Sequence, residues 1–267
     1  MLCGDLRCRT ASSNITYPHG NPNYSTRRTE TIKGLAGIYE VRRRHMEMYA
    51  DLSKRMSRIL GLESSPIAIS FSTEPPEGVE QLKNRIRLCQ MLDKVRLEGV
   101  SFYTNVESHG CDGGAYSCGL IQLSERLKTG EFLAKELGLF GSTRAARRFI
   151  SSIPRIDPGS VKVVTFSPLE RATSEPDVVV LICNAKQGME IAEAVAYESG
   201  KHTRGLTGPP ICSAVVAYPL LTGEVVYSLG DMGARRSMKV RDEDIFVGIP
   251  AELVPAIVEN LAKLRGA

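Results

Sequence analysis

The sequence predicts an α/β (or α+β) fold, with a mixed sheet of about five to seven strands and flanking helices. Short runs rich in β-branched residues, such as "PIAISFS", "VKVVTFS" and "DVVVLICN", are typical of buried strands. Segments with apolar residues at helical spacing alternate with these runs. The hydrophobic content of 42% and charged content of 24% are ordinary for a globular domain.

The first 33 residues differ in composition from the rest of the chain. Residues 1–33 are rich in Ser, Thr, Asn, Pro and Arg and show no periodicity, so we expect a disordered tail. The tail contains Cys3 and Cys8, which we interpret as unstructured thiols because no apolar anchor would hold them in place. A single domain is then expected over residues 34–267.

The first part of this domain shows two long helical patterns and two strands. Gly61 ends the first helix, Pro66 opens the first strand, and Ser142 is a suitable N-cap for the last short helix. Glycines at 130 and at 138–141 separate the short helices. The expected elements are a helix at 39–60, a strand at 66–72, a helix at 79–98, a strand at 100–106 and three short helices between 120 and 153.

The second part repeats this alternation. Its strands are rich in Val and Ile, Gly200 ends its long helix, and Pro209-Pro210 forms a rigid turn before a short helix. The expected elements are strands at 161–167 and 177–184, a helix at 185–200, a turn and short helix at 208–223, a strand at 224–230, a turn or helix at 231–240, a strand at 244–250 and a helix at 251–266.

A cysteine followed by Ala-Tyr occurs in each part of the domain. Cys111 precedes Ala115-Tyr116 and Cys212 precedes Ala217-Tyr218. This weak similarity raises the possibility of two similar half-domains, 34–155 and 156–267.

Charge and apolar patterning exclude several function classes. The net charge of +4 is small and much of it lies at residues 27–28 and 42–44, whereas nucleic-acid binding needs a continuous basic face. No apolar run approaches the roughly 20 residues of a membrane span, and the N-terminus lacks the apolar core of a secretory signal. We therefore expect a cytoplasmic protein whose seven cysteines serve metal binding, catalysis or packing.

Several cysteines are expected at loop–helix junctions. In "ESHGCDGGAYSCGL", Cys111 follows a strand and precedes Gly113 and Gly114, which leave room for a bulky group. A helix that begins near Gly114 would place Cys118 in its first turn, and the turn "GPPIC" places Cys212 at another helix start. Soft thiolate ligands select zinc, iron–sulfur clusters or copper(I).

The remaining candidates have two interpretations each. Cys89 lies on an apolar helical stripe, yet Arg85 and Arg87 beside it would favour a thiolate. Cys183 ends a buried strand, where cysteine usually acts as a small hydrophobic residue. His109 is either a solvated loop residue or a further ligand.

The turn "SLGDMGARRS" is a second candidate binding loop. Gly230 and Gly233 allow backbone N–H groups to converge, and Arg235 could bind a carboxylate or phosphate. The alternative is a strand-to-helix corner with a surface arginine pair.

The motifs "PIAISF", "RLCQ", "CDGGAYSCGL", "CSAVVAYPLLTGEVVYSLGDMGARRS" and "DEDIFVGIPAELV" together resemble domain of unknown function family 169, the uncharacterised ArCR proteins of archaea and anaerobic bacteria. The resemblance runs from Leu52 to the C-terminus. It singles out Cys89, Cys111, Cys212 and the turn at 230–235. Many relatives have cysteine where this chain has Asp231, so a four-cysteine site would here use Asp231 or recruit Cys118 as the fourth ligand.

Three functions follow as hypotheses. The first is a thiolate-ligated metal centre, an iron–sulfur cluster rather than zinc or flavin, with a redox or cofactor-handling role and a redox partner or small anionic ligand. The second is an enzyme with Cys111 as nucleophile, His109 or Asp112 as base and Arg235 as anion holder. The third is a flavin- or tetrapyrrole-binding module, although no GxGxxG motif follows a strand.

Overall fold

A computed structural model describes residues 35–266 of the chain, with side chains from residue 44 onward. The expected tail, with Cys3 and Cys8, lies outside the described residues. The described residues belong to one compact unit built around a seven-stranded mixed sheet, so the α/β class is confirmed. Among the helices that the structure describes, none is both long and apolar enough to span a membrane.

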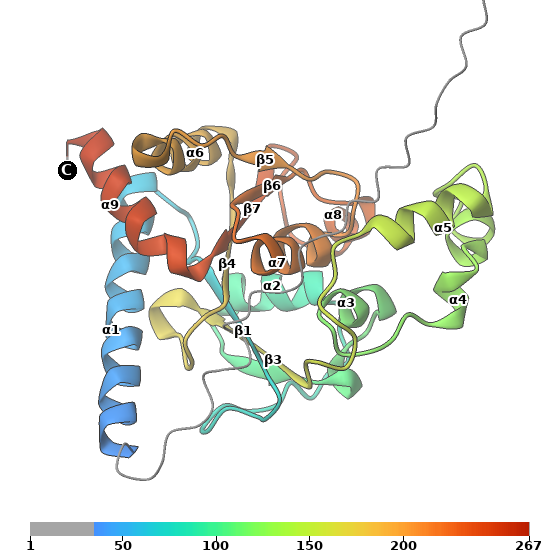
Figure 1. Cartoon of the computed structure of the whole chain (residues 1–267), viewed down its shortest axis with the longest axis horizontal. Helices are drawn as coiled ribbons and strands as arrows, with labels where there is room; N and C mark the ends of the chain where they lie inside the picture. The colour runs from blue at the N-terminus through green and yellow to red at the C-terminus, as the bar shows by residue number, and fades with distance from the viewer. Residues whose placement is uncertain (1–34, 267) are drawn as a thin grey trace, which may run out of the picture. The chain divides into compact units, whose positions relative to one another are not determined.

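The sheet has the strand order β2-β3-β1-β4-β7-β6-β5 (Figure 1). All neighbouring strands pair antiparallel except β5 and β6, which pair parallel. The strands are β1 (Ile67–Ser72), β2 (Phe102–Thr104), β3 (Val163–Pro168), β4 (Val178–Asn184), β5 (Arg204–Gly205), β6 (Val226–Ser228) and β7 (Asp244–Pro250).

Helices of three kinds connect the strands. The α-helices are α1 (Leu35–Leu60), α2 (Leu88–Glu98), α3 (Asp112–Ser117), α4 (Glu125–Lys128), α5 (Thr143–Ser152), α6 (Ala185–Ser199), α7 (Tyr218–Thr222), α8 (Met232–Ser237) and α9 (Val254–Arg265). The 3-10 helices are η3 (Val106–Ser108), η5 (Leu169–Arg171) and η7 (Ala251–Leu253), and the π-helices are η4 (Phe132–Glu136) and η6 (Cys212–Ala217).

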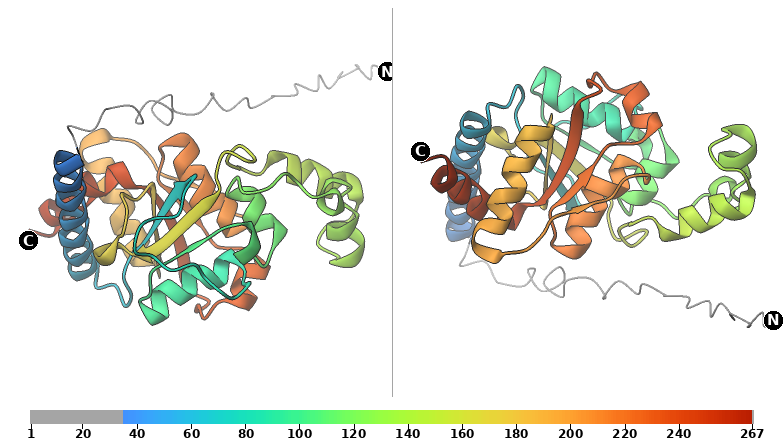
Figure 2. Two further views of the ribbon diagram at one scale, coloured as in Figure 1. Left: turned by 90° about the horizontal axis from the view of Figure 1, so that it is seen from below. Right: turned by 90° about the horizontal axis from the view of Figure 1, so that it is seen from above.

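Two helical layers cover the two faces of the sheet (Figures 1 and 2). Successive side chains of a strand point to opposite faces, so Ile67 and Ile69 of β1 enter one core cluster and Ala68 enters the other. The first cluster includes α2, α3, η6 and α8, and the second includes α1, α6 and α9. Four of the cysteines discussed below, at 89, 111, 118 and 212, belong to the layer of α2, α3, η6 and α8 or to the loops that enter it.

Most elements occur where the sequence predicts them, including the three short helices between 120 and 153, which are α4, η4 and α5. Ser142 caps α5 as expected, because its hydroxyl accepts the N–H of Ala145 at 3.2 Å. The helix expected over 79–98 is wrong in its first half, since α2 begins only at Leu88. The backbone N–H of Leu82 instead donates to the carbonyl of Tyr103 at 2.8 Å, which holds residues 80–82 beside β2.

The sheet contains two similar units arranged around a pseudo-two-fold axis. The first repeat (67–171) orders its strands β2-β3-β1, and the second repeat (178–253) orders them β4-β7-β6. The strands β1 and β4 meet antiparallel, with Ile67 opposite Val180, Ala68 opposite Val179 and Ile69 opposite Val178. This register is symmetric about Ala68 and Val179.

Hydrogen bonds repeat at equivalent positions of the two units. The N–H of Leu169 donates to Pro66 at 2.8 Å, and the N–H of Ala251 donates to Asp177 at 3.1 Å; each donor begins a 3-10 helix after a strand-ending proline. The bond from Leu82 to Tyr103 likewise has its counterpart in a bond from Leu206 to Tyr227 at 2.7 Å. The sheet therefore repeats one topology twice, while the division into half-domains 34–155 and 156–267 stays a prediction.

Candidate functional site

Four candidate ligands occupy the first turns of four helices. Cys89 is the second residue of α2, and Cys212 is the first residue of η6. Cys111 and Asp231 are the N-caps of α3 and α8, and each side chain accepts a backbone N–H three residues later, at 3.2 Å and 2.9 Å. The first turn of a helix presents unpaired N–H groups that favour negatively charged sulfur or oxygen.

The four positions form two equivalent pairs in the repeated fold. Helix α2 opens with the bond from Met91 N–H to the carbonyl of Arg87, at 3.0 Å, and the helical segment of Cys212 opens with the bond from Ala214 to Pro210, at 2.9 Å. Cys89 and Cys212 both lie two residues after these acceptor carbonyls.

The N-caps Cys111 and Asp231 form the second pair, since each precedes a six-residue helix between equivalent strands, β2 and β3 in the first repeat and β6 and β7 in the second. Their carbonyls accept the N–H of Ala115 at 3.2 Å and of Arg235 at 2.9 Å. The structure thus pairs Cys111 with Asp231, whereas the Ala-Tyr similarity in the sequence pairs Cys111 with Cys212.

Backbone contacts join the loops that lead into these helices. The N–H of Gly110 donates to Ile86 at 2.7 Å, which brings the segment before Cys111 alongside the segment before Cys89. Gly110 is required at this contact, because a Cβ atom there would lie 2.8 Å from the Ile86 carbonyl carbon. In the second repeat, the Asp231 carboxylate accepts the N–H of Ile211 at 3.0 Å, which joins the starts of α8 and η6.

The charge of Cys111 acts on the ionisation of the Cys89 and Cys212 thiols. Burial, and after it the charges of Cys111 and Asp231, raises the pKa of Cys89 to about 11. Burial also raises the pKa of Cys212 well above its ordinary value, and the charges of Cys111 and Cys118 add to this effect. Without a bound cation, Cys89 and Cys212 are therefore protonated near neutral pH.

Two other cysteines have different surroundings. Cys118 ends α3 rather than starting it, so the expectation of a first-turn position is wrong. Its side chain is completely buried, and burial followed by the charge of Cys111 raises its pKa. Cys183 lies in the core cluster on the opposite face of the sheet, in agreement with a packing role.

The glycines of the two candidate loops differ in what constrains them. Gly230 has a φ of 83°, and a Cβ atom there would lie 2.7 Å from the Phe246 ring. A Cβ atom on Gly233 would lie 3.0 Å from Asp231 Oδ1, and one on Gly114 would lie 3.2 Å from Cys111 Sγ. A Cβ atom on Gly113 would meet nothing within 4 Å, so this glycine leaves open space beside Cys111.

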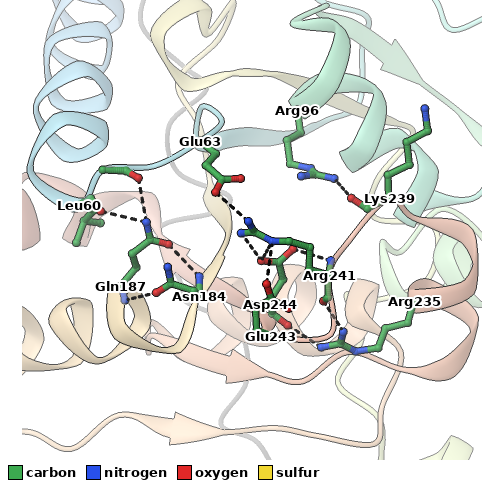
Figure 3. A network of polar contacts seen from close by, with 11 residues as sticks. Leu60, Glu63, Arg96, Asn184, Gln187, Arg235, Lys239, Arg241, Glu243 and Asp244 are labelled. Carbon is green, nitrogen blue, oxygen red and sulfur yellow. Dashed lines mark hydrogen bonds and ion pairs between the residues drawn. The ribbon is translucent and has the colours of Figure 1, made fainter.

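Arg235 uses its guanidinium to hold backbone together. Its Nε donates to Leu229 at 2.7 Å, and its two terminal nitrogens donate to the carbonyls of Arg241 at 3.0 Å and Asp244 at 2.6 Å. Figure 3 shows Arg235 directed toward these two residues. Three of its five N–H groups are thereby occupied. This favours a role for Arg235 in holding the strand-to-helix corner together over a role in binding an anion.

His109 is buried, with 2% of its surface exposed, rather than solvated. Its Nε2 lies 3.1 Å from Thr104 Oγ1, and that hydroxyl donates to the carbonyl of Val164 at 3.3 Å. Thr104 therefore accepts from Nε2–H, and Nδ1 carries a lone pair that has no hydrogen-bond partner among the described residues. A Cβ atom on Gly114 would lie 3.7 Å from this Nδ1 and 3.2 Å from Cys111 Sγ, so both atoms border Gly114.

Sequence reasoning missed Thr104, which orients this imidazole. A polar residue at the end of a buried strand, five positions before a histidine, is the signal that points to it.

The buried imidazole predicts a loss of stability in acid. Burial, and after it the charge of Arg85, lowers the pKa of His109 from 6.5 to about 4. Between these values the unfolded chain binds a proton that the folded chain does not, so the free energy of unfolding decreases as the pH falls. We expect His109 to account for about 2 kcal/mol of the stability lost by metal-free protein between neutral pH and pH 4.5 in urea unfolding.

The variant His109→Gln keeps an amide N–H for Thr104 and lacks the titrating ring. Its stability should therefore fall less over the same pH interval. If the variant and the wild type lost equal stability between neutral pH and pH 4.5, His109 would not be the source of the loss.

The described side chains do not form a ready site for one metal ion. Within residues 44–266, no group of three or more His, Cys, Asp and Glu side chains has the arrangement needed to hold an ion. The five cysteines in this part of the chain are all free thiols. The four positions thus share one helical layer, and the charges of Cys111 and Asp231 act on the thiols of Cys89 and Cys212.

Comparisons with known proteins agree with the motifs. The uncharacterised protein MJ0308 of Methanocaldococcus jannaschii is 28% identical over 219 residues, which cover 80% of this chain and 93% of that protein. No solved structure matches the chain. The family model described as "Uncharacterised ArCR" matches residues 55–260. The chain therefore belongs to domain of unknown function family 169, the uncharacterised ArCR proteins.

Proposed function

We propose that this protein binds a thiolate-ligated metal centre, an iron–sulfur cluster, at the starts of α2, α3, η6 and α8. The observation that carries this proposal is the pairwise equivalence of Cys89 with Cys212 and of Cys111 with Asp231. Burial, and after it the charges of Cys111 and Asp231, raises the pKa of the Cys89 and Cys212 thiols there, and such thiols gain stability when a cation replaces their protons. The role is a redox or cofactor-handling one.

A polynuclear centre suits this arrangement better than a single ion. The ligands of one zinc ion must all lie within about 2.3 Å of it, and the described side chains form no such group. The ligands of a cluster bind different iron atoms and are correspondingly farther apart. We therefore propose iron–sulfur over zinc for this donor set, with Cys89, Cys111 and Cys212 as ligands.

The helix starts supply the electrostatic setting. Thiolates carry negative charge, and the N–H groups of first turns stabilise it; Gly114 already donates to Cys111 Sγ at 3.2 Å. The cluster would supply electron transfer or Lewis acidity, and the chain would tune it through these N–H groups and through burial. Cys212, with 5% of its surface exposed, would form the buried side and Cys111 the more open side.

Anaerobic purification followed by iron and acid-labile sulfide analysis tests the proposal. We expect stoichiometric iron and sulfide, or their recovery on reconstitution, with the broad sulfur-to-iron absorption of a cluster. A colourless preparation that cannot be reconstituted would refute it. The absorption bands of a flavin or a tetrapyrrole would instead identify the third hypothesis.

The fourth ligand is expected to be Asp231 rather than Cys118. Asp231 occupies the position equivalent to Cys111, whereas Cys118 lies at the end of α3 in the core. Asp231→Cys should therefore give a cluster that survives air exposure longer, because a thiolate is the stronger ligand for iron. Cys118→Ala should keep the wild-type iron content, measured on the same preparations.

If Cys118→Ala lost iron while Asp231→Ala kept it, Cys118 rather than Asp231 would be the fourth ligand. Cys118 is buried, so each variant's circular dichroism must first match that of the wild type.

One observation favours the second hypothesis, a cysteine-nucleophile enzyme. The unpaired Nδ1 of His109 and the Cys111 sulfur both border Gly114, and Thr104 orients the ring as the third member of a catalytic triad does. This function predicts one thiol, Cys111, that iodoacetamide alkylates faster than the rest. A metal centre predicts that Cys89, Cys111 and Cys212 are protected together until the metal is removed.

A further inference from the structure

Helices α4, η4 and α5 form an arm, residues 125–152, that projects away from the sheet and its two helical layers (Figures 1 and 2). The arm has its own packing, since the rings of Phe140 and Phe149 lie 4.9 Å apart and Ile150 is buried. A Cβ atom on Gly130, after α4, would lie 2.6 Å from the Thr143 carbonyl oxygen, so this loop lies directly against the start of α5. The arm is therefore a folded unit, although α4 and η4 contain no buried residue.

One face of α5 carries cations that no acid neutralises. Arg144, Arg147 and Arg148 are exposed, and none of them forms an ion pair within the described part of the chain. Their spacing of three and four residues places them on one face of the helix, where like charges repel. The acids of the arm are unavailable to them, because each is already in an ion pair with another basic residue. These pairs are Glu125 with Lys128 at 2.5 Å, Glu131 with Lys135 at 2.6 Å and Glu136 with Arg126 at 2.7 Å.

A surface of opposite charge lies at the edge strand β2. Two exposed carboxylates there, of Glu80 and Glu107, form no ion pair with any residue that the structure describes. Both line a cavity of about 500 Å³, and among its lining residues Lys83 is the one cation. Glu74 and Glu77, which are also exposed, precede Glu80 in the loop after β1. The cavity and this loop together form a net acidic surface, which we call the acidic face.

Hydrogen bonds fix the backbone of the acidic face. Asn105 Oδ1 accepts the N–H groups of Glu107 and Ser108 at 3.1 Å and 3.2 Å. It also accepts the side-chain amide of Gln81 at 3.1 Å. The Ser108 hydroxyl in turn donates to the Leu82 carbonyl at 3.0 Å. The two segments of the face are thus joined within the chain, so a partner need not order them on binding.

We propose that the arm of one chain docks on the acidic face of a second copy, and that the reverse contact forms at the same time. The arginines of α5 and the carboxylates of the acidic face are both left without ion pairs in one chain, and a guanidinium matches a carboxylate with two parallel hydrogen bonds. Two reciprocal contacts of this kind close a two-fold dimer. Exposed apolar side chains accompany both surfaces: Leu137 and Leu139 on the arm, each 49% exposed, and Val106 beside Glu107, 46% exposed.

This inference goes beyond the proposed function and does not depend on a bound metal. Glu107 belongs to η3, which leads directly into His109 and Cys111. The docked arm would therefore lie against the segment that carries the candidate ligand Cys111.

Sedimentation velocity of the metal-free full-length protein in about 20 mM and about 500 mM salt tests the inference. We expect a dimer at low salt whose dissociation constant rises at least about tenfold at high salt, because salt screens exposed charges. Reversing the arm charges in Arg147→Glu with Arg148→Glu, or those of the acidic face in Glu80→Lys with Glu107→Lys, should give monomers. An equimolar mixture of the two variants should restore the dimer, since both contacts then join opposite charges again.

Lys54→Glu with Arg58→Glu serves as the matched control, because these exposed residues of α1 change the net charge by the same amount as the arm variant. It should dimerise as the wild type does. All the substituted side chains are exposed, so each variant should keep the circular dichroism of the wild type. A wild-type protein that is monomeric at low salt would overturn the inference. So would dimers of either charge-reversed variant alone, or a mixture of the two that stays monomeric.

Discussion

Replacing Cys212 by Ser is expected to abolish iron binding while the protein stays folded. Cys212 is the most buried of the three proposed cysteine ligands, and its sulfur lies 3.6 Å from the Ser117 hydroxyl in the same core. Serine has nearly the same shape but does not supply a thiolate, so the loss of a soft ligand is separated from the creation of a cavity. Iron and sulfide per chain, measured after identical anaerobic reconstitution, give the readout.

Cys183→Ser is the matched control for this experiment. Cys183 is also a buried free thiol, with 3% of its surface exposed, but it belongs to the core on the other face of the sheet. The control should retain its iron, although burying a hydroxyl there costs some stability. Equal iron contents in the two variants would show that Cys212 is not a ligand.

Replacing Gly248 by Ala is expected to lower the free energy of unfolding by about 3 kcal/mol, a large effect for one methyl group. Gly248 lies in β7 between Val180 of β4 and Val226 of β6. A Cβ atom there would lie 2.4 Å from the Val215 carbonyl oxygen and 2.8 Å from its Cα. Both are backbone atoms of η6, which cannot rotate away as a side chain can.

Urea unfolding measures this loss, and Gly205→Ala provides the comparison. A Cβ atom on Gly205 in β5 would meet only the Tyr227 carbonyl oxygen, at 3.9 Å, so we expect a change within about 0.5 kcal/mol. If Gly248→Ala were as stable as Gly205→Ala, the close packing of the η6 backbone on Gly248 of β7 would be contradicted. Because η6 begins at Cys212, the variant should also bind less iron.

The position equivalent to Gly248 in the first repeat is Phe166, since both residues lie two places before the strand-ending proline. The Phe166 ring stacks on Phe102, with their centroids 5.6 Å apart. The two repeats therefore share strand topology but fill their cores differently. Direct packing of η6 on the sheet belongs to the second repeat, and this is why a glycine is needed there.

The sequence by itself determined the α/β class, most strands and helices, and the family. These features rest on local patterns: β-branched runs, helical periodicity, and stop signals such as Gly61 and Gly200. It also indicated correctly that Cys183 packs in the core. Local patterns failed where long-range contacts prevailed, as at residues 80–82, where pairing with β2 prevented the helix expected from Val79 onward.

Only the tertiary structure decided which side chains share a site and which positions are equivalent. The contact of Gly110 with Ile86 and that of Ile211 with Asp231 join segments twenty or more residues apart, and periodicity carries no information about such pairings. The burial of His109 likewise depends on Thr104 and on the neighbouring strand. Spacing along a chain dictates local geometry, whereas the choice of distant neighbours is made by the packing of the whole sheet.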